Sequence, residues 1–599
     1  MKEILKNIIQ LISYRESAGP EDFILEENLF DKKAVESNQG GSGEPPIFAE
    51  KEGADSVNEG RDEGSSQSKG RVRSRRRKKG ESSGEEPEQQ SNGGDQVHGS
   101  LEQNRNRIDQ IYGLPVNKDL IVRSFTMGTS PPTGGFAIFI DGLADRTTVN
   151  LLLQNLMVHT RMYCNNEGSP ASYIMKNLLP GSQIRTLDSF KKIADSVNYG
   201  DTAFFFQGSA QAIVVETKGW ERRAVSRPNV EQTISGPQES FVENLRVNTG
   251  LVRKIIRSEK LFTELFQIGA RFPSDVAVMY LKDLANPQLV EEVKRRISSI
   301  TVDYVNDIGI LEQFIEDDPY SMNSQTLSTE RPDRVAALLA EGKVAILLGG
   351  SPFALVVPVT MYSQMHTGEE VYLRWQYGTF LRYIRTISFY LALLLPGSYL
   401  AVVLYHQEMV PTELLLFIAG NREKVPFPTL VEMLLMEFSF ELVREAGLRI
   451  PGIIGSTIGI VGALILGQTA VQANIVSPIL VILVAVTGLA SFSIPSYSLA
   501  FAVRIYRFFY IIMGSVLGFF GISIVLYVQI LLTTNLKSFG VPYLSPTGPR
   551  THSGPDIVFR LPIFMHRRRP DYLNPQDDIR MSQNPRGWVE EGNGGEKQG

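Results

Sequence analysis

The chain carries no charged residue between Arg449 and Arg504. A helix needs about 20 apolar residues to cross the hydrocarbon core of a bilayer, so this stretch has room for two spanning helices and a tight turn. Two further apolar runs flank it, Thr386–Tyr405 and Phe508–Leu536. A soluble core does not need four such segments in the last third of a chain. The sequence therefore predicts an all-α polytopic membrane domain over residues 376–537, with spans near 386–406, 452–472, 475–496 and 508–532.

Averages over the whole chain conceal this domain, because a polar half offsets an apolar half. The 43% of hydrophobic residues and the net charge of -5 are those of an ordinary soluble protein. The single cysteine, Cys164, excludes an internal disulfide and a thiol-rich metal site, and the six histidines show no metal-ligand spacing. We therefore expect no metal and no cofactor.

The first 30 residues form a short amphipathic segment. Their apolar residues recur at the spacing of one helix face, at Ile4, Leu5, Ile8, Ile9 and Ile12. A signal peptide would have an unbroken apolar core and a small-residue cleavage site, and this segment has neither. We expect the polar region before the first span to stay in the cytosol.

Residues 31–104 are rich in Gly, Ser, Glu, Gln, Asn and basic residues and nearly free of aromatic ones. Such a composition buries too little apolar area to offset the entropy of ordering, which predicts a disordered linker. Its basic run, Arg71–Lys79, has the composition that binds anionic lipid or nucleic acid. The alternative is a solvated linker of mixed charge, and no nucleic-acid partner is expected.

Residues 105–375 predict a cytosolic α/β domain, in two lobes because of its length. Strand patterns occur at 136–142 and Ser274–Leu281, and a hairpin pattern at 202–217 surrounds Gln207-Gly208-Ser209. Helix patterns occur at Phe241–Arg257 and Gln288–Ile297. A helix and two strands around Gly349-Gly350 complete the domain.

This domain shows no sign of catalysis. The glycines of GGFAIFIDGLAD precede the strand, whereas a phosphate-binding loop follows a strand and opens a helix. No Ser/His/Asp or Cys/His arrangement exceeds coincidence, so the chain is not expected to be an enzyme.

Small residues recur every four positions in the uncharged stretch and again in the last apolar run. That spacing places them on one helix face, where they let two backbones approach closely within a membrane. One interpretation is an oligomer-forming bundle, and the other is packing within one subunit. The candidate packing residues are Gly455, Gly459, Ala463, Gly467, Gly514 and Gly518.

Three acidic residues, Glu437, Glu441 and Glu445, share one face of a helix within Pro428–Gly447. Carboxylates at membrane depth are costly unless they face water, so such a stripe marks a candidate ion or proton path. The alternative is an interfacial helix lying flat with its acids in solvent. Residues 411–447 are accordingly expected to be re-entrant or interfacial.

The distribution of basic residues gives a partly contradictory topology. Arginines precede the first span, and Lys537 and Arg567–Arg569 follow the last, so both termini are expected to be cytoplasmic, with 538–599 a polar tail. Four crossings satisfy this arrangement. They place Arg504 and Arg507 outside, however, against the positive-inside rule.

Five stretches together resemble the GerA family, the A-type subunits of spore germinant receptors. The resemblance runs from about Asp119 to Pro546, and residues 32–100 lie outside the common pattern. The stretches are Ser226–Arg253, Glu330–Pro358 (ERPDRVAALLAEGKVAILLGGSPFALVVP), Leu393–Leu415, Phe440–Val471 and Lys537–Pro546 (KSFGVPYLSP).

The resemblance implies a multi-pass protein of the spore inner membrane that acts with a transporter-like B subunit and a lipoprotein C subunit. It implies a homo-oligomer that releases monovalent cations when a nutrient triggers it. Two other functions are kept open: a poreless transducer or scaffold of the same complex, and a sporulation-stage relative that aids ion or solute movement.

Overall fold

A computed structural model describes residues 95–128, 132–158, 183–219, 227–228, 230–449, 467–551, 557–582, 585–586 and 588. Several predictions from the sequence concern residues outside these ranges. They are the amphipathic segment 1–30, the linker 31–104 except for its last residues, the basic run Arg71–Lys79, and the packing residues Gly455, Gly459 and Ala463.

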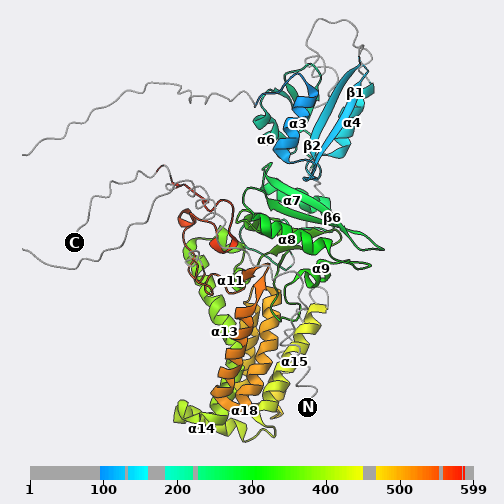
Figure 1. The fold of residues 1–599 in the computed structure, drawn as a ribbon. Coiled ribbons are helices and arrows are strands. Elements are labelled where there is room, and N and C mark those ends of the chain that lie inside the picture. The colour runs from blue at the N-terminus through cyan, green and yellow to red at the C-terminus, as the bar shows by residue number, and fades with distance from the viewer. Residues whose placement is uncertain are drawn as a thin grey trace, which may run out of the picture. The chain divides into compact units, whose positions relative to one another are not determined.

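The first part of the α/β domain is built on a five-stranded sheet in the order β1-β2-β4-β5-β3, and every pairing in it is antiparallel. Helices α3 and α6 cover one face and α4 covers the other (Figure 1). The elements are α3 (Leu101–Tyr112), β1 (Leu120–Met127), β2 (Thr133–Ile140), α4 (Arg146–Val158), β3 (Ile184–Leu187), α6 (Phe190–Asn198), β4 (Thr202–Phe206) and β5 (Ala212–Val215).

The second part repeats this plan with the order β6-β7-β9-β10-β8, again antiparallel. Helices α8 and α9 pack on one face, and α7 and α10 on the other. The elements are α7 (Leu245–Ile255), β6 (Leu261–Ile268), β7 (Ser274–Leu281), α8 (Pro287–Ser298), α9 (Ile308–Ile315), β8 (Leu327–Thr329), α10 (Pro332–Leu339), β9 (Val344–Leu348) and β10 (Ala354–Val357).

The sequence patterns of this domain are confirmed as elements. The strand predicted at Ser274–Leu281 is β7, and the predicted hairpin is β4 paired with β5. In β7 the side chains alternate between the two cores, Val276 and Val278 on one face, Ala277 and Met279 on the other, as a two-residue period requires. Because helices cover both faces, both sets of side chains are apolar.

The C-terminal part is helical. In the described part of this region, short helices α11 (Met361–Met365) and α12 (Glu369–Tyr372) lead into five longer ones. Among the described residues, α13 and α18 are long and apolar enough to cross a membrane. Figure 1 shows α13, α15 and α18 as neighbours. The longer helices are α13 (Trp375–Tyr405), α14 (Thr412–Arg422), α15 (Thr429–Arg449), α17 (Pro478–Phe492) and α18 (Tyr497–Asn535).

Helix α18 is not one continuous rod. At Gly518 the backbone leaves the helical region, with φ 61° and ψ -143°. The Tyr510 hydroxyl donates to Gln529 Oε1 at 2.6 Å. In a straight helix 19 residues would separate these groups by about 28 Å. The chain therefore folds back at Gly518, and the predicted span near 508–532 straddles the turn. Hydropathy did not reveal it, because an apolar run does not record the direction of the chain.

The chain then returns to the α/β domain. A hairpin of β11 (Lys537–Ser538) and β12 (Val541–Pro542) buries Phe539 completely in the core under β6–β10. The stretch 538–599, expected as a polar tail, is partly packed: Arg560 donates to Leu373 and Val371 carbonyls, and Arg569 to that of Ala340. Short 3-10 turns occur at Gln407–Met409, Ile563–Met565 and Asp571–Leu573.

Candidate functional site

Helix α15 carries the acidic stripe, and its first two members face neighbouring helices. Glu437 is fully buried, and one of its carboxylate oxygens lies 2.9 Å from Arg507 Nη2 on α18. The same nitrogen donates to Glu441 Oε1 at 3.1 Å. One guanidinium nitrogen thus lies between two carboxylates that are one helical turn apart.

Two further arginines surround Glu441. Arg504 Nη1 lies 3.5 Å from its Oε2, and Arg444, three residues later on α15, forms an ion pair with the same oxygen. We call these five residues the charge cluster: Glu437, Glu441, Arg444, Arg504 and Arg507. It contains two carboxylates and three guanidinium groups, so its formal charge is +1. Glu445 is exposed and lies outside the cluster.

Helix α18 places the two distant arginines because they are three residues apart and share a helix face. Arg504 Nε donates to the Ala500 carbonyl at 3.1 Å, and its guanidinium faces the ring of Phe501. Both arginine side chains are almost completely buried. Burying a charge this deeply is costly unless it is paired, so the acids of α15 and the arginines of α18 stabilise each other.

The pairing is incomplete in hydrogen-bonding terms. Among the described residues, neither Glu437 oxygen accepts a well-aligned hydrogen bond, and Arg507 Nε and Nη1 find no acceptor. A partly satisfied buried network gives up much of the energy that a complete network would supply. The charge cluster therefore holds α15 and α18 together less tightly than its short distances imply.

Sequence reasoning identified the acids but missed their partners. The sequence did contain a sign of these partners: with four crossings, Arg504 and Arg507 lie outside, against the positive-inside rule. In the structure both guanidinium groups are buried against carboxylates of α15. A fourth acid on α15, Glu432, was also missed. It is buried, and its Oε2 accepts from the Ser477 amide at the start of α17.

Of the described packing glycines, Gly514 lies at a close contact between two helices. A Cβ added to Gly514 would lie 2.6 Å from the Gly397 carbonyl oxygen, and one added to Gly397 would lie 2.6 Å from that of Tyr510. The backbones of α13 and α18 thus approach closely at a glycine pair, of which Gly397 was missed. Gly467 has an ordinary contact, with Val481 at 3.4 Å, and Gly518 forms the turn of α18.

Both ends of the helical region are held by the α/β domain and the segment that follows it. Glu370 on α12 accepts from Arg382 Nε at 2.5 Å and also from Arg385, both on α13. Burial raises the pKa of Glu370, but the positive charges of His366, Arg382 and Arg385 outweigh burial and hold it below its usual range. At the other end, Ser538 Oγ donates to the Gln325 carbonyl.

These features define a class of two-part proteins, in which an antiparallel α/β domain precedes apolar helices with a buried charge cluster. Within the described part of the chain, no group of three or more His, Cys, Asp or Glu side chains is placed to hold a metal ion.

The family model of the Bacillus/Clostridium GerA spore germination protein matches residues 106–572. The chain is 36% identical to spore germination protein KA of Bacillus subtilis (strain 168), covering 78% of this chain and 86% of the relative. It is 37% identical to spore germination protein GerLA of Bacillus cereus, covering 80% and 97%. It is 38% identical to the uncharacterized membrane protein YfkQ of Bacillus subtilis (strain 168), covering 76% and 87%.

Among solved structures, the N-terminal domain of the A subunit of the Bacillus megaterium spore germinant receptor GerK3 matches 44% of this chain. The match covers 96% of that chain, with 26% identity and a TM-score of 0.35. The protein described here belongs to the GerA family.

Proposed function

We propose that this chain is the A subunit of a nutrient germinant receptor in the spore inner membrane, working with a transporter-like B subunit and a lipoprotein C subunit. Support comes from the family and from relatives named as spore germination proteins. In this proposal the apolar helices cross the membrane several times and the chain forms a homo-oligomer.

The contacts at both ends of the helical region support an even number of crossings. Arg382 near the start of α13 and Ser538 after α18 both contact residues from the same side, Glu370 and Gln325. Helix α15 has 21 residues, the length of a crossing helix, and in this proposal the two arms of α18 on either side of Gly518 each cross once. The remaining crossings in this proposal are α13, α17 and the span predicted from the sequence near 452–472, which lies mostly outside the described residues, so the count becomes six instead of four.

We further propose that the assembled subunits form a cation channel and that the charge cluster is part of its gate. The observation that carries this proposal is the fully buried Glu437 beside Arg507. With the arginines in place, the acids are neutralised and offer no binding site to a cation. Movement of α18 away from α15 would expose two carboxylates. A triggering signal from the partner subunits would therefore have to favour the separated state.

A poreless transducer is the second candidate, and the excess of arginine over acid in the charge cluster favours it. A cation path is normally lined by net negative charge. In this alternative the cluster only fastens α15 to α18, and the signal passes through the direct connections between the helices and the α/β domain.

Glutamine substitutions separate the two candidates. Glu437→Gln with Glu441→Gln removes the acids with little change in volume, and exposed Glu445→Gln is the matched control. We expect the double variant to change the cation selectivity or open probability of the purified protein in planar bilayers and to alter cation release from germinating spores. Unchanged cation release in the double variant would contradict the gate and favour the transducer.

A further inference from the structure

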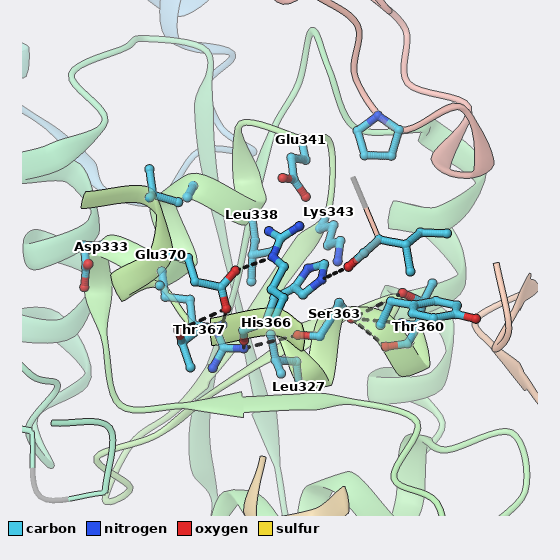
Figure 2. A pocket seen from close by; sticks show the side chains of 18 of the residues that line it. Leu327, Asp333, Leu338, Glu341, Lys343, Thr360, Ser363, His366, Thr367 and Glu370 are labelled. Carbon is cyan, nitrogen blue, oxygen red and sulfur yellow. Dashed lines mark hydrogen bonds and ion pairs between the residues drawn. The ribbon is translucent and has the colours of Figure 1, made fainter. Parts of the chain in front are cut away.

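A cavity of about 240 Å³, with several charged side chains in its wall, lies where the α/β domain meets the start of α13 (Figure 2). Its wall is formed by residues of α10, α11 and α12 and by the residues just before β9. Arg382 of α13 and Ile557 and Tyr572 from the C-terminal segment complete it. The cavity is far larger than the space that one water molecule needs.

Lys343 lines this cavity and is 1% exposed. Among the described residues, its ammonium group has no acceptor within hydrogen-bonding distance and no acid within 4.0 Å. Burial lowers the pKa of Lys343, and the negative charge of Glu341, at a greater distance, offsets only part of this effect. An ammonium group that is so nearly buried and has no counter-ion is costly, and proteins normally avoid it.

Most other ionised groups around the cavity are already paired, whereas Glu341 adds a negative charge to its wall. Arg334 donates to Glu231 at 2.7 Å, Asp333 accepts from Arg331 at 2.8 Å, and Glu370 is held by Arg382. These pairs leave the Lys343 ammonium as the positive charge that an incoming group would meet. Figure 2 shows Lys343 in the lining, with Glu341, Ser363 and His366 labelled around it.

We propose that this cavity binds an oxyanion, a phosphate or carboxylate group, with Lys343 as its counter-ion. The site is independent of the channel proposal. Because Arg382 of α13 lines the same cavity, a bound oxyanion would lie against both the α/β domain and the first long helix.

The oxyanion has two sources. One is a small soluble anion. The other is the headgroup of an anionic phospholipid, because a second cavity of about 610 Å³ shares Tyr362, His366, Arg382 and Ile557 with the first. Its apolar wall, which includes Phe389, Leu393 and Ile530, fits an acyl chain.

The test uses the full chain in neutral detergent, with thermal unfolding followed in chloride buffer and with added inorganic phosphate. We expect phosphate to raise the unfolding midpoint of the unsubstituted protein in a saturable way. Lys343→Met keeps the length of the side chain and removes its charge, so its apparent phosphate affinity should fall roughly tenfold or more. Lys260→Met, at a lysine whose side chain is 55% exposed, is the control and should behave as the unsubstituted protein does.

Two further measurements test the role of Lys343 and distinguish the two sources of the oxyanion. In chloride alone, Lys343→Met should unfold at the same temperature as the unsubstituted protein or higher, because it no longer buries an unpaired charge. In nanodiscs, a stabilisation by phosphatidylglycerol over phosphatidylcholine that is lost in Lys343→Met identifies the lipid source. A phosphate response in phosphatidylcholine discs identifies the soluble source. If neither anion shifts the midpoint, or if Lys343→Met responds equally, the proposal is overturned.

Discussion

Single buried charges in this protein are held by partners from distant parts of the sequence. Arg253 on α7 is 2% exposed, and its Nε lies 2.5 Å from Asp119, which precedes β1. Its Nη2 also donates to the Leu261 carbonyl at 2.8 Å. One side chain thus joins a residue at the edge of the first sheet to the second.

Among the described residues, removing this guanidinium leaves the buried Asp119 carboxylate paired with Arg246 alone, 3.3 Å away. We expect Arg253→Met to lower the free energy of unfolding by roughly 3–5 kcal/mol, as loss of one partner of a buried ion pair does. Chemical denaturation of the full chain in detergent measures this change. Arg271→Met, at a side chain 76% exposed, is the control, and an equal loss there would contradict the assignment.

Glu316, just after α9, is a residue whose charge opposes folding. Burial raises its pKa to about 7, although the Gln325 amide donates to it, and Glu312, Asp317 and Asp318 add to the rise. An acid with a raised pKa binds its proton more tightly in the folded state. Its contribution to stability is therefore greatest below the unfolded pKa and is lost as the pH rises toward 7.

We expect Glu316→Gln to be more stable than the unsubstituted protein at pH 8, by up to about 3 kcal/mol, with the difference vanishing near pH 4. Unfolding midpoints measured across this range test the prediction. Exposed Glu291→Gln should show no such trend. If Glu316→Gln is less stable than the unsubstituted protein at pH 8, the folded state favours the ionised form of Glu316, and the prediction is contradicted.

At the scale of elements, the contact between α13 and α18 depends on the absence of side chains. The backbones of Gly397 and Gly514 lie so close that a Cβ on either would overlap a carbonyl oxygen of the other helix. Close backbone approach gives dispersion and weak polar contacts that a membrane environment does not otherwise supply.

Gly514→Ala should therefore force the two helices apart and destabilise the protein by about 1–3 kcal/mol. Gly420→Ala on α14 is a matched control, because no atom lies within 4 Å of the added Cβ, and alanine favours a helix. Thermal unfolding in detergent compares them. Equal midpoints for the two variants would show that the α13–α18 contact tolerates a methyl group.

For the whole molecule, the hairpin of β11 and β12 is the connection between the last helix and the α/β domain. Phe539 is completely buried in that domain, with the Arg296 guanidinium 4.2 Å from its ring centre. Its amide donates to Asp317. Movement of the end of α18 therefore acts directly on the second sheet and its helices.

Phe539→Ala should cost about 3–5 kcal/mol of stability, as truncation of a buried aromatic does. It should also loosen the end of α18, seen as faster amide hydrogen exchange at 533–545. Phe314→Ala, at a side chain 49% exposed on α9, is the control and should change neither quantity. Unchanged exchange in Phe539→Ala would show that the hairpin does not anchor the helix.

The sequence determined the class of each half of this chain, because period and composition are local. A short run of apolar residues predicted β7, and apolar length predicted α13. The acidic stripe was also visible, since Glu437 and Glu441 lie four residues apart.

Only the tertiary structure decided how distant residues meet. It placed Arg507 against Glu437, turned α18 back at Gly518, and left Lys343 buried in a cavity. None of these follows from a local pattern, because each depends on which segments pack together. Periodicity assigns a residue to a face, whereas the partner on the facing element, and hence the fate of a buried charge, is fixed only when the elements assemble.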